Sequence, residues 1–207
     1  MKMLPALAVR WTFLRGFLRS PRGVGAIAPS SRWLVGEMVD AARVKHARTV
    51  VEFGSGTGAV TTEIIRHLPA RARLIAFEVD EHFAATLRAR ITDPRVTIIT
   101  ASAADADLHL AQLGITSVDC VVSSLPLTSL PRPITEAILQ TTVNVLRPGG
   151  LLVTYQFSAA VRALLKRYFP RTQADRLVFR NLPPAIVFVC PREHEPARVR
   201  FVEPQFV

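Results

Sequence analysis

Glycines at every second position give the sequence its clearest chemical signal. Gly54, Gly56 and Gly58 lie in the segment VVEFGSGTG, where an apolar run typical of a buried strand leads into the helical pattern of residues 60–67. Glycines at a strand-to-helix turn let the backbone bend sharply and approach a ligand closely, and the start of the helix offers free N–H groups. The segment therefore predicts a small-molecule site at this turn.

Acidic residues accompany these glycines. Glu52 comes before the first glycine, and Glu78 ends the next expected strand, about twenty residues after the loop, where an acid can accept hydrogen bonds from both hydroxyls of a ribose. Asp80 is the alternative for that contact, although its position is better suited to capping the helix that follows. The pattern indicates a ligand that carries a ribose.

The loop resembles motif I (E/D-x-G-x-G-x-G) of class I methyltransferases, which implies S-adenosylmethionine as cofactor and S-adenosylhomocysteine as product. Gly54, Gly56 and Ala59 also fit the G-x-G-x-x-A variant of the NAD fingerprint, but an acid before the glycines suits a sulfonium amino acid better than a pyrophosphate. The cofactor-binding residues that the resemblance implies are Glu52, Gly54, Ser55, Gly56, Thr57, Gly58, Glu78, Val79, Ser102, Ala103 and Ser123.

The adenine contact departs from the family pattern. Many relatives carry Gly-Asp-Ala after the third strand, and the aspartate bonds the adenine amine; this chain has Ala101, Ser102 and Ala103 there. Either Ser102 replaces the aspartate or Asp105 reaches in, and the sequence leaves both open.

Alternating strand and helix patterns supply the framework that these residues need. Short β-branched runs predict strands at residues 49–53, 74–78, 96–100, 118–123, 151–157, 177–180 and 185–190, with helices at 60–67, 81–90, 105–113, 134–146 and 159–169. Such alternation predicts a mainly parallel sheet covered on both faces. Pro183 and Pro184 cannot continue a ladder, so the last two strands should form an antiparallel hairpin. The expected fold is α/β, a Rossmann-like class I methyltransferase with seven strands.

The net charge and the Cys and His content of the chain limit the kinds of partner and site that can be expected. The chain has 207 residues, about one domain, and a formal net charge of +10, which predicts an anionic partner surface, either nucleic acid or acidic lipid. Cys120 and Cys190 lie in apolar runs and are expected to be buried thiols. The five histidines show no ligand spacing, so no metal site is expected.

The segment after the fourth strand bears on the substrate. Adenine-N6 methyltransferases have N-[IL]-P-[YF] at this place, whereas this chain has Ser124, Leu125, Pro126 and Leu127. A hydroxyl cannot reproduce the donor–acceptor pair of an amide, and a leucine cannot stack on a base. The segment therefore argues against rRNA adenine methylation and makes nucleic acid an unexpected partner.

A longer set of motifs, GAIAPSSR, VVEFGSGTG, SSLPL, TYQFS and VFRNLPPA, resembles bacterial phospholipid N-methyltransferases of the rhizobial type, roughly over residues 20–190. That resemblance implies methylation of phosphatidylethanolamine and its mono- and dimethyl forms to phosphatidylcholine. Ser55 replaces the proline usual in the family's glycine loop. The alternatives are an rRNA adenine-N6 or other small-substrate methyltransferase, and a non-catalytic, membrane-associated S-adenosylmethionine-binding module.

A lipid amine must be neutral to accept the methyl group, which costs roughly 4 kcal/mol at pH 7 if lysine is the guide. Tyr155 is the candidate to orient the amine, with Ser124 as a further acceptor. Aromatic walls favour a quaternary ammonium, and an arginine could meet the lipid phosphate. The substrate-binding residues expected on these grounds are Ser30, Trp33, Leu125, Pro126, Phe157 and Arg180.

The N-terminus predicts a membrane contact. On a helical wheel, residues 1–22 place Leu4, Leu7 and other apolar side chains on one arc with arginines at its flanks, the pattern of an interfacial helix; docking on the protein's own core is the alternative. The membrane-binding residues expected are Arg10, Trp11, Leu14, Arg15, Phe17, Leu18 and Arg19.

The expected organisation therefore has an amphipathic helix (1–22), a flap and helix over the site (23–48), the methyltransferase domain (49–193) and a tail (194–207). We expect a cytoplasmic protein that is peripheral on the inner face of the membrane, at an anionic phospholipid surface. The number of methylations, the recruiting lipid and the oligomeric state stay open.

Overall fold

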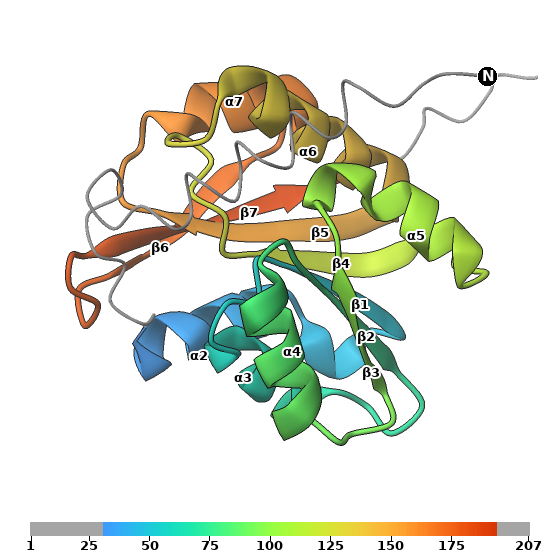
Figure 1. Cartoon of the computed structure of the whole chain (residues 1–207). Helices are drawn as coiled ribbons and strands as arrows, with labels where there is room; N and C mark the ends of the chain where they lie inside the picture. Colours follow the sequence, from blue (N-terminus) through green and yellow to red (C-terminus); the bar gives the residue numbers. More distant parts are fainter. Residues whose placement is uncertain (1–30, 194–207) are drawn as a thin grey trace, which may run out of the picture.

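A seven-stranded sheet organises residues 31–193, the part of the chain that the computed structural model describes (Figure 1). Its strand order is β3-β2-β1-β4-β5-β7-β6. The strands are β1 (Thr49–Phe53), β2 (Arg73–Glu78), β3 (Val96–Thr100), β4 (Val118–Ser123), β5 (Leu146–Gln156), β6 (Gln173–Val178) and β7 (Ala185–Pro191). The helices are α2 (Arg32–Ala41), η1 (Val44–His46), α3 (Ala59–His67), α4 (Glu81–Arg90), η2 (Ala103–Asp105), α5 (Ala106–Gln112), α6 (Arg132–Val145) and α7 (Val161–Tyr168).

The pairing confirms the expected fold class. β1 to β5 are parallel where they pair, whereas β7 runs antiparallel to both β5 and β6. The bounds of β1, β3, β4 and α4 match those expected from the sequence. The predicted N-terminal helix at residues 1–22 lies outside the described residues.

Two strand predictions were wrong in their limits. The sixth strand was expected at residues 177–180 but runs over Gln173–Val178, because an irregular register between Ala174 and Arg176 breaks the alternation that marks a strand in sequence. β5 starts at Leu146, well before residue 151, and its early residues pair across a register shift in β4 that a sequence pattern does not reveal.

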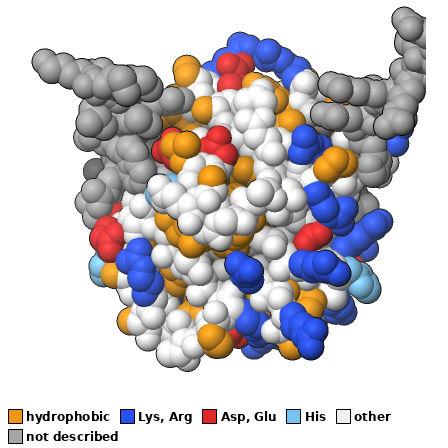
Figure 2. All heavy atoms as spheres, turned by 90° about the vertical axis from the view of Figure 1, so that its right-hand side faces the viewer, with side chains coloured by type: hydrophobic (Ala, Val, Ile, Leu, Met, Phe, Trp, Pro, Cys, Tyr) orange, Lys and Arg blue, Asp and Glu red, His pale blue; other side chains and the backbone are white. Residues whose placement is uncertain are grey.

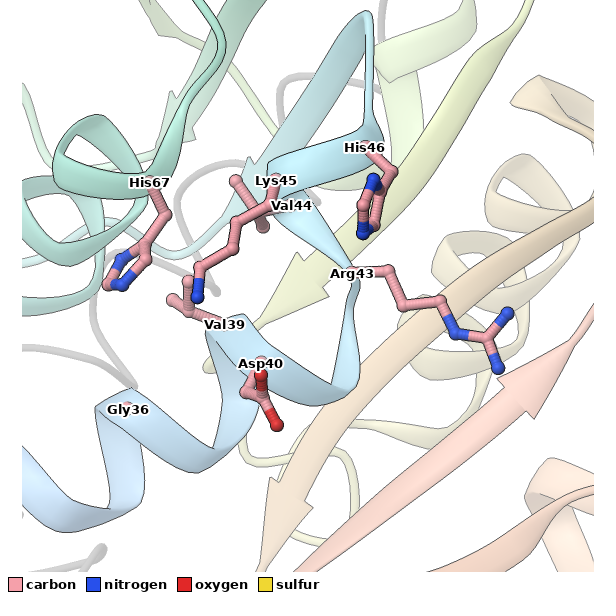
Figure 3. A pocket seen from close by; sticks show the side chains of 8 residues that line it. All are labelled: Gly36, Val39, Asp40, Arg43, Val44, Lys45, His46 and His67. Atoms are coloured by element: carbon pink, nitrogen blue, oxygen red, sulfur yellow. The ribbon is translucent and has the colours of Figure 1, made fainter.

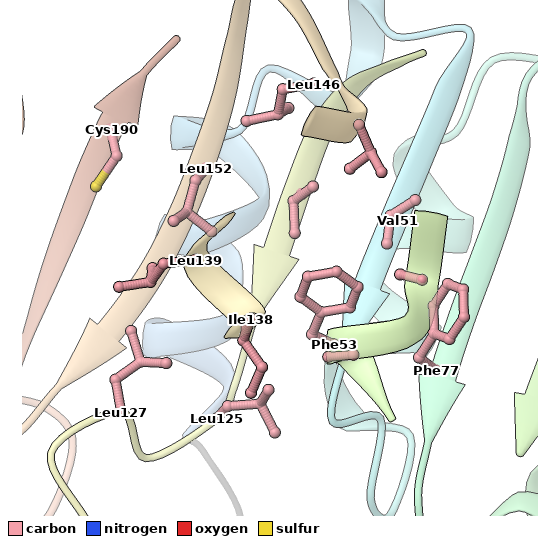
Figure 4. Packing of buried hydrophobic residues seen from close by; sticks show 14 of the residues in the cluster. Val51, Phe53, Phe77, Leu125, Leu127, Ile138, Leu139, Leu146, Leu152 and Cys190 are labelled. Atoms are coloured by element: carbon pink, nitrogen blue, oxygen red, sulfur yellow. The ribbon is translucent and has the colours of Figure 1, made fainter. Parts of the chain in front are cut away.

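Apolar side chains pack on both faces of the sheet. One face, with Val51 and Phe53, packs against α5, α6 and α7, and Figure 4 shows Ile138 and Leu139 among these side chains. The other face, with Val50, packs against α2 and α3. Both free cysteines are buried as expected, and burial raises the pKa of each thiol to about 12.

One edge of the sheet gathers the segments of interest. The parallel strands β1, β2, β4 and β5 all end at this edge. The register of the antiparallel strands, Gln156 with Ile186 and Val178 with Ala185, puts the turn between β6 and β7 at the same edge. No helix within residues 31–193 is long and apolar enough to cross a bilayer.

Candidate active site

The strand order reverses between β1 and β4, and open α/β sheets bind ligands at the carboxyl ends of the strands on either side of such a switch point. Phe53 and Ser123 are paired at these ends, and the Ser124 N–H donates to the Phe53 carbonyl at 2.9 Å. The glycine loop and the SSLPL segment therefore leave the sheet side by side.

The glycine turn requires its glycines. Gly54, Gly56 and Gly58 have φ values of +76°, +49° and +84°, in the left-handed region. A Cβ on Gly54 would lie 2.8 Å from Leu125 Cδ2, and one on Gly58 would lie 2.4 Å from Leu87 Cδ2. A Cβ on Gly56 would meet no atom within 4 Å. The turn is thus tightly packed on both sides of Gly56 and open at Gly56 itself, where a ligand can approach.

Glu78 fixes this turn. Its Oε2 accepts from the Gly56 N–H at 2.7 Å, and its Oε1 accepts from the Asp80 N–H at 2.9 Å. Burial raises the pKa of Glu78, and these backbone donors oppose the rise. Asp80 caps α4, as expected, by accepting from the His82 N–H at 2.8 Å. Each Glu78 oxygen keeps a second lone pair, so contact with ribose hydroxyls stays compatible with these bonds.

Glu52 lies fully buried on the sheet face that α2 and α3 cover. Within residues 31–193, neither of its carboxyl oxygens has a hydrogen-bond partner of normal geometry, and neither does the Thr61 hydroxyl. Burial raises the pKa of Glu52 to about 8; the nearby Thr61 lowers it, and the charge of Glu78 raises it further. A buried carboxyl without partners is costly, so it marks a place for a donor group of a ligand. The ammonium of S-adenosylmethionine is such a group.

The adenine side offers both residues that the sequence left open. Ser102 is buried next to Ala103, and its hydroxyl accepts from the Ala104 N–H at 3.2 Å, which starts η2. Asp105 follows at the start of α5 and is partly exposed. Val79 is buried at the end of β2.

The SSLPL segment is fixed by apolar packing and by a hydrogen bond from Gln156, a residue to which the sequence analysis gives no role. Leu125 and Leu127 point into the core near Ile138 (Figure 4). The Gln156 side chain is buried and donates to the Leu125 carbonyl at 2.9 Å. Of the TYQFS motif, the sequence predicts roles only for the aromatic residues, whereas a polar glutamine among buried strand residues is the signal for Gln156.

Ser124 and Tyr155 lie at neighbouring positions of the sheet edge. The last paired residues of β4 and β5 are Ser123 and Thr154, so the next residue of each chain segment lies alongside the other. The Ser124 hydroxyl is buried with no partner among the described residues, and Tyr155 is buried on the α2 face. Phe157 contacts Tyr155 edge to face, with ring centroids 5.6 Å apart. The predicted catalytic and aromatic residues thus lie together, with Pro126 partly exposed nearby in sequence.

Trp33 and Arg180 form a separate group. The guanidinium carbons of Arg32 and Arg180 lie 5.0 and 4.6 Å from the Trp33 ring centroid. Asn181, which the sequence reasoning also missed, accepts from the Ser31 N–H at 3.0 Å and so joins the β6–β7 turn to the start of α2. Ser30 and the predicted membrane-binding residues lie outside the described residues.

A cavity between α2, η1 and the end of α3 has no predicted site residue in its lining (Figure 3). Arg43, Lys45, His46 and His67 line it together with Asp40. Basic side chains at the carboxyl ends of helices are favoured by the helix dipole, which accounts for their presence here.

Comparison with known proteins places the chain among methyltransferases. The sequence family described as "Methyltransferase domain" matches residues 50–150. An ornithine lipid N-methyltransferase from Singulisphaera acidiphila is 32% identical over 183 residues, which cover 86% of this chain and 93% of that protein.

Solved structures with the same fold differ in their substrates. An O-methyltransferase from Bacillus cereus in complex with S-adenosylhomocysteine aligns with a TM-score of 0.60 and 18% identity, over 91% of this chain and 93% of that one. An RNA methyltransferase from Salinibacter ruber, also in complex with S-adenosylhomocysteine, aligns with a TM-score of 0.56 and 19% identity, over 83% and 97%. At this identity the likeness shows the fold alone.

Proposed function

Because this chain belongs to the class I S-adenosylmethionine-dependent methyltransferases, we propose that it methylates the amine of phosphatidylethanolamine and of its mono- and dimethyl forms, giving phosphatidylcholine. S-adenosylmethionine is its methyl donor. One structural observation carries the proposal for an amine: the Ser124 hydroxyl is buried without a partner among the described residues, and it follows β4 next to the position of Tyr155 on β5. The similarity to a lipid N-methyltransferase along nearly its whole length supports a lipid.

The donor supplies an electrophilic methyl group on a sulfonium, and the chain holds it. The open turn at Gly56 would take the methionine part, the Glu52 carboxyl its ammonium, and Glu78 the ribose. Ser102 or Asp105 would meet the adenine between Val79 and Ala103. Ser123, whose hydroxyl accepts from the Leu125 N–H at 3.3 Å, would link this site to the substrate segment.

The substrate amine has to lose a proton and point its lone pair at the methyl group. Tyr155 and Ser124 would orient it by hydrogen bonds, and the buried surroundings would favour the neutral amine. The Leu125 carbonyl accepts from the Gln156 side chain and from the Leu127 N–H, both at 2.9 Å, and these bonds would hold the segment that carries Ser124 in place. Phe157 would flank the methylated ammonium, and the released proton would pass to water.

Tyr155→Phe tests this arrangement. We expect methylation to fall about fivefold to tenfold, because an orienting hydrogen bond contributes roughly 1 kcal/mol, while S-adenosylmethionine binding is kept. Tyr168, the other tyrosine of the chain, lies on α7, so Tyr168→Phe serves as the matched control. Unchanged turnover in Tyr155→Phe would remove the proposed role.

A second candidate substrate is ornithine lipid, which the name of the similar protein favours. Both candidates present an amine at a membrane surface, and both agree with a chain of net charge +10. We propose that residues 1–22 bind that surface as an amphipathic helix and that the protein is peripheral on the inner face of the cytoplasmic membrane. Competition between vesicles of the two lipids for label from one donor pool would rank the substrates.

A further inference from the structure

The turn between β6 and β7 exposes large apolar side chains. Phe179 is 74% exposed and Leu182 is 86% exposed, more than any other large hydrophobic residue within residues 31–193. Isolated exposed hydrophobic residues are common on soluble proteins, but two on one short turn are a reason to look for a partner.

Hydrogen bonds of the turn leave these two side chains facing outward. Asn181 lies between them, is buried, and donates to the Pro183 carbonyl at 2.7 Å while accepting from the Ser31 N–H. With Asn181 tied inward to both the turn and the start of α2, Phe179 and Leu182 project on either side of it. Their exposure is therefore a fixed feature of the hairpin.

Basic and amphipathic side chains adjoin the turn. Trp33 is 45% exposed, with Arg32 and Arg180 on its ring. Neither arginine forms an ion pair with an acid in the described part of the chain, whereas Arg176 on β6 is paired with Glu37. Tryptophan and arginine together are favoured where hydrocarbon meets charged headgroups. Charge and shape here match a bilayer interface with anionic lipid.

The position of the β6–β7 turn also agrees with a membrane contact. The turn lies at the carboxyl edge of the sheet, where β5 ends in Gln156 opposite Ile186, one residue before Phe157. Figure 1 shows it beside the start of α2. Ser31, its hydrogen-bonded neighbour, closely follows the segment in which the sequence predicts an interfacial helix.

We propose that the β6–β7 turn is a second membrane-docking element, which inserts Phe179 and Leu182 into the interface of a bilayer that contains anionic lipid. The proposal rests on the proposed lipid substrate and adds the surface that brings the active-site edge to it. Figure 2 shows a different face, with Lys and Arg gathered on one side and hydrophobic atoms in small separate patches. Positive charge is therefore also present away from the turn, and the projecting apolar pair distinguishes the turn.

A fluorophore at the tip tests the insertion in the full chain. Cys120 and Cys190 are buried with raised thiol pKa values, so Leu182→Cys can be labelled selectively with a polarity-sensitive dye. With vesicles of phosphatidylethanolamine and phosphatidylglycerol we expect a blue shift and quenching by brominated acyl chains. A dye at Leu108→Cys on α5 should stay in water. No shift on vesicle binding, or a dye already in an apolar setting without lipid, would overturn the proposal.

Two double variants distinguish membrane docking from methyl transfer. Phe179→Ser/Leu182→Ser should weaken vesicle binding at least about tenfold, whereas Leu108→Ser/Leu113→Ser, which removes exposed apolar side chains from another surface, should not. Turnover of a monomeric short-chain phosphatidylethanolamine should be equal in both pairs. Equal vesicle binding by the two pairs would overturn the docking proposal; absence of turnover in the unmodified chain would instead contradict the proposed function.

Discussion

Two regions of the carboxyl edge, the glycine end after β1 and the hairpin end between β6 and β7, have opposite physical character. Around the glycine turn, Glu52 and Glu78 are buried carboxyls whose pKa values are raised by burial. At the β6–β7 turn, Phe179 and Leu182 are exposed beside Arg180. The first region is buried and acidic, as a site for the ammonium of the cofactor requires, and the second is an exposed apolar and basic surface. One sheet edge thus combines the proposed cofactor site with the proposed membrane-docking surface.

The two regions also differ in the hydrogen bonds that fix them. The Gly56 and Asp80 N–H groups donate to Glu78, whereas the Glu52 carboxyl has no hydrogen-bond partner among the described residues. At the hairpin tip, the buried Asn181 side chain accepts from the Ser31 N–H and donates to the Pro183 carbonyl. Cofactor binding should therefore respond to pH and to the loss of a buried charge. Surface binding should respond to salt and to the loss of apolar area.

The largest effect expected concerns folding stability at the acidic end. The pKa of Glu52 rises on folding from 4.5 to about 8, so the folded state binds the proton more tightly. Its contribution is full below about pH 4.5 and is lost as pH rises to about 8, at about 1.4 kcal/mol per pKa unit. Without ligand, Glu52→Gln should be several kcal/mol more stable than the unchanged chain at pH 8 and little different at pH 5, by urea unfolding.

Glu63→Gln on α3 is the control for that experiment, since Glu63 is a partly exposed acid paired with Arg66. A stability gap between Glu52→Gln and the unchanged chain that does not grow with pH would show that Glu52 is not the buried acid described.

The second effect is on the cofactor. Glu52→Gln should weaken S-adenosylmethionine binding by about fiftyfold at pH 8, because a hydrogen bond to a charged group contributes roughly 1.5–3 kcal/mol. Calorimetry would measure it, and Phe179→Ser should leave the same affinity unchanged. Equal S-adenosylmethionine affinity in Glu52→Gln and the unchanged chain would contradict the proposed role of Glu52 in cofactor binding.

A smaller effect concerns the segment between them. Gln156→Leu removes the side-chain donor to the Leu125 carbonyl and leaves the Leu127 N–H as its backbone donor. It should lower kcat about fivefold while S-adenosylmethionine affinity is kept, since one neutral hydrogen bond contributes about 1 kcal/mol. Gln140→Leu, on the exposed surface of α6, is the control. A parallel loss of cofactor affinity would assign Gln156 to the cofactor end or to general stability.

The smallest effect belongs to the basic surface. Arg180→Gln should weaken binding to anionic vesicles about threefold to fivefold at low salt, in line with roughly 1 kcal/mol per basic residue near such a surface. The loss should vanish at high salt. Arg167→Gln is the control, because Arg167 is paired with Glu136 on α6. A loss that persists at high salt would point to packing on Trp33 rather than to charge.

Local patterns sufficed for most of the fold and for the cofactor end. Alternation and β-branched runs located β1, β3 and β4, and the spacing of Gly54, Gly56 and Gly58 located the turn, because each signal lies within a few residues. The predicted limits of β6 were wrong, because its irregular register is set by pairing with β7 and is not visible in its own sequence.

Contacts between distant residues were beyond such reasoning. Asn181 bonds Ser31 across 150 residues, and Gln156 bonds Leu125 across 31. Neither pairing has a local spacing to reveal it. The exposure of Phe179 was also beyond local patterns, because the sequence predicts a strand over 177–180, in which an apolar residue is expected to be buried. β6 instead ends at Val178 and leaves Phe179 in the exposed turn.

The most direct test of the proposed function mixes the full chain and methyl-labelled S-adenosylmethionine with phosphatidylethanolamine vesicles, with and without anionic lipid. Parallel samples contain ornithine lipid vesicles or ribosomal RNA. We predict label in mono-, di- and trimethylated phosphatidylethanolamine, with more label when anionic lipid is present. Label confined to RNA, or to ornithine lipid, would contradict the assignment of phosphatidylethanolamine as substrate.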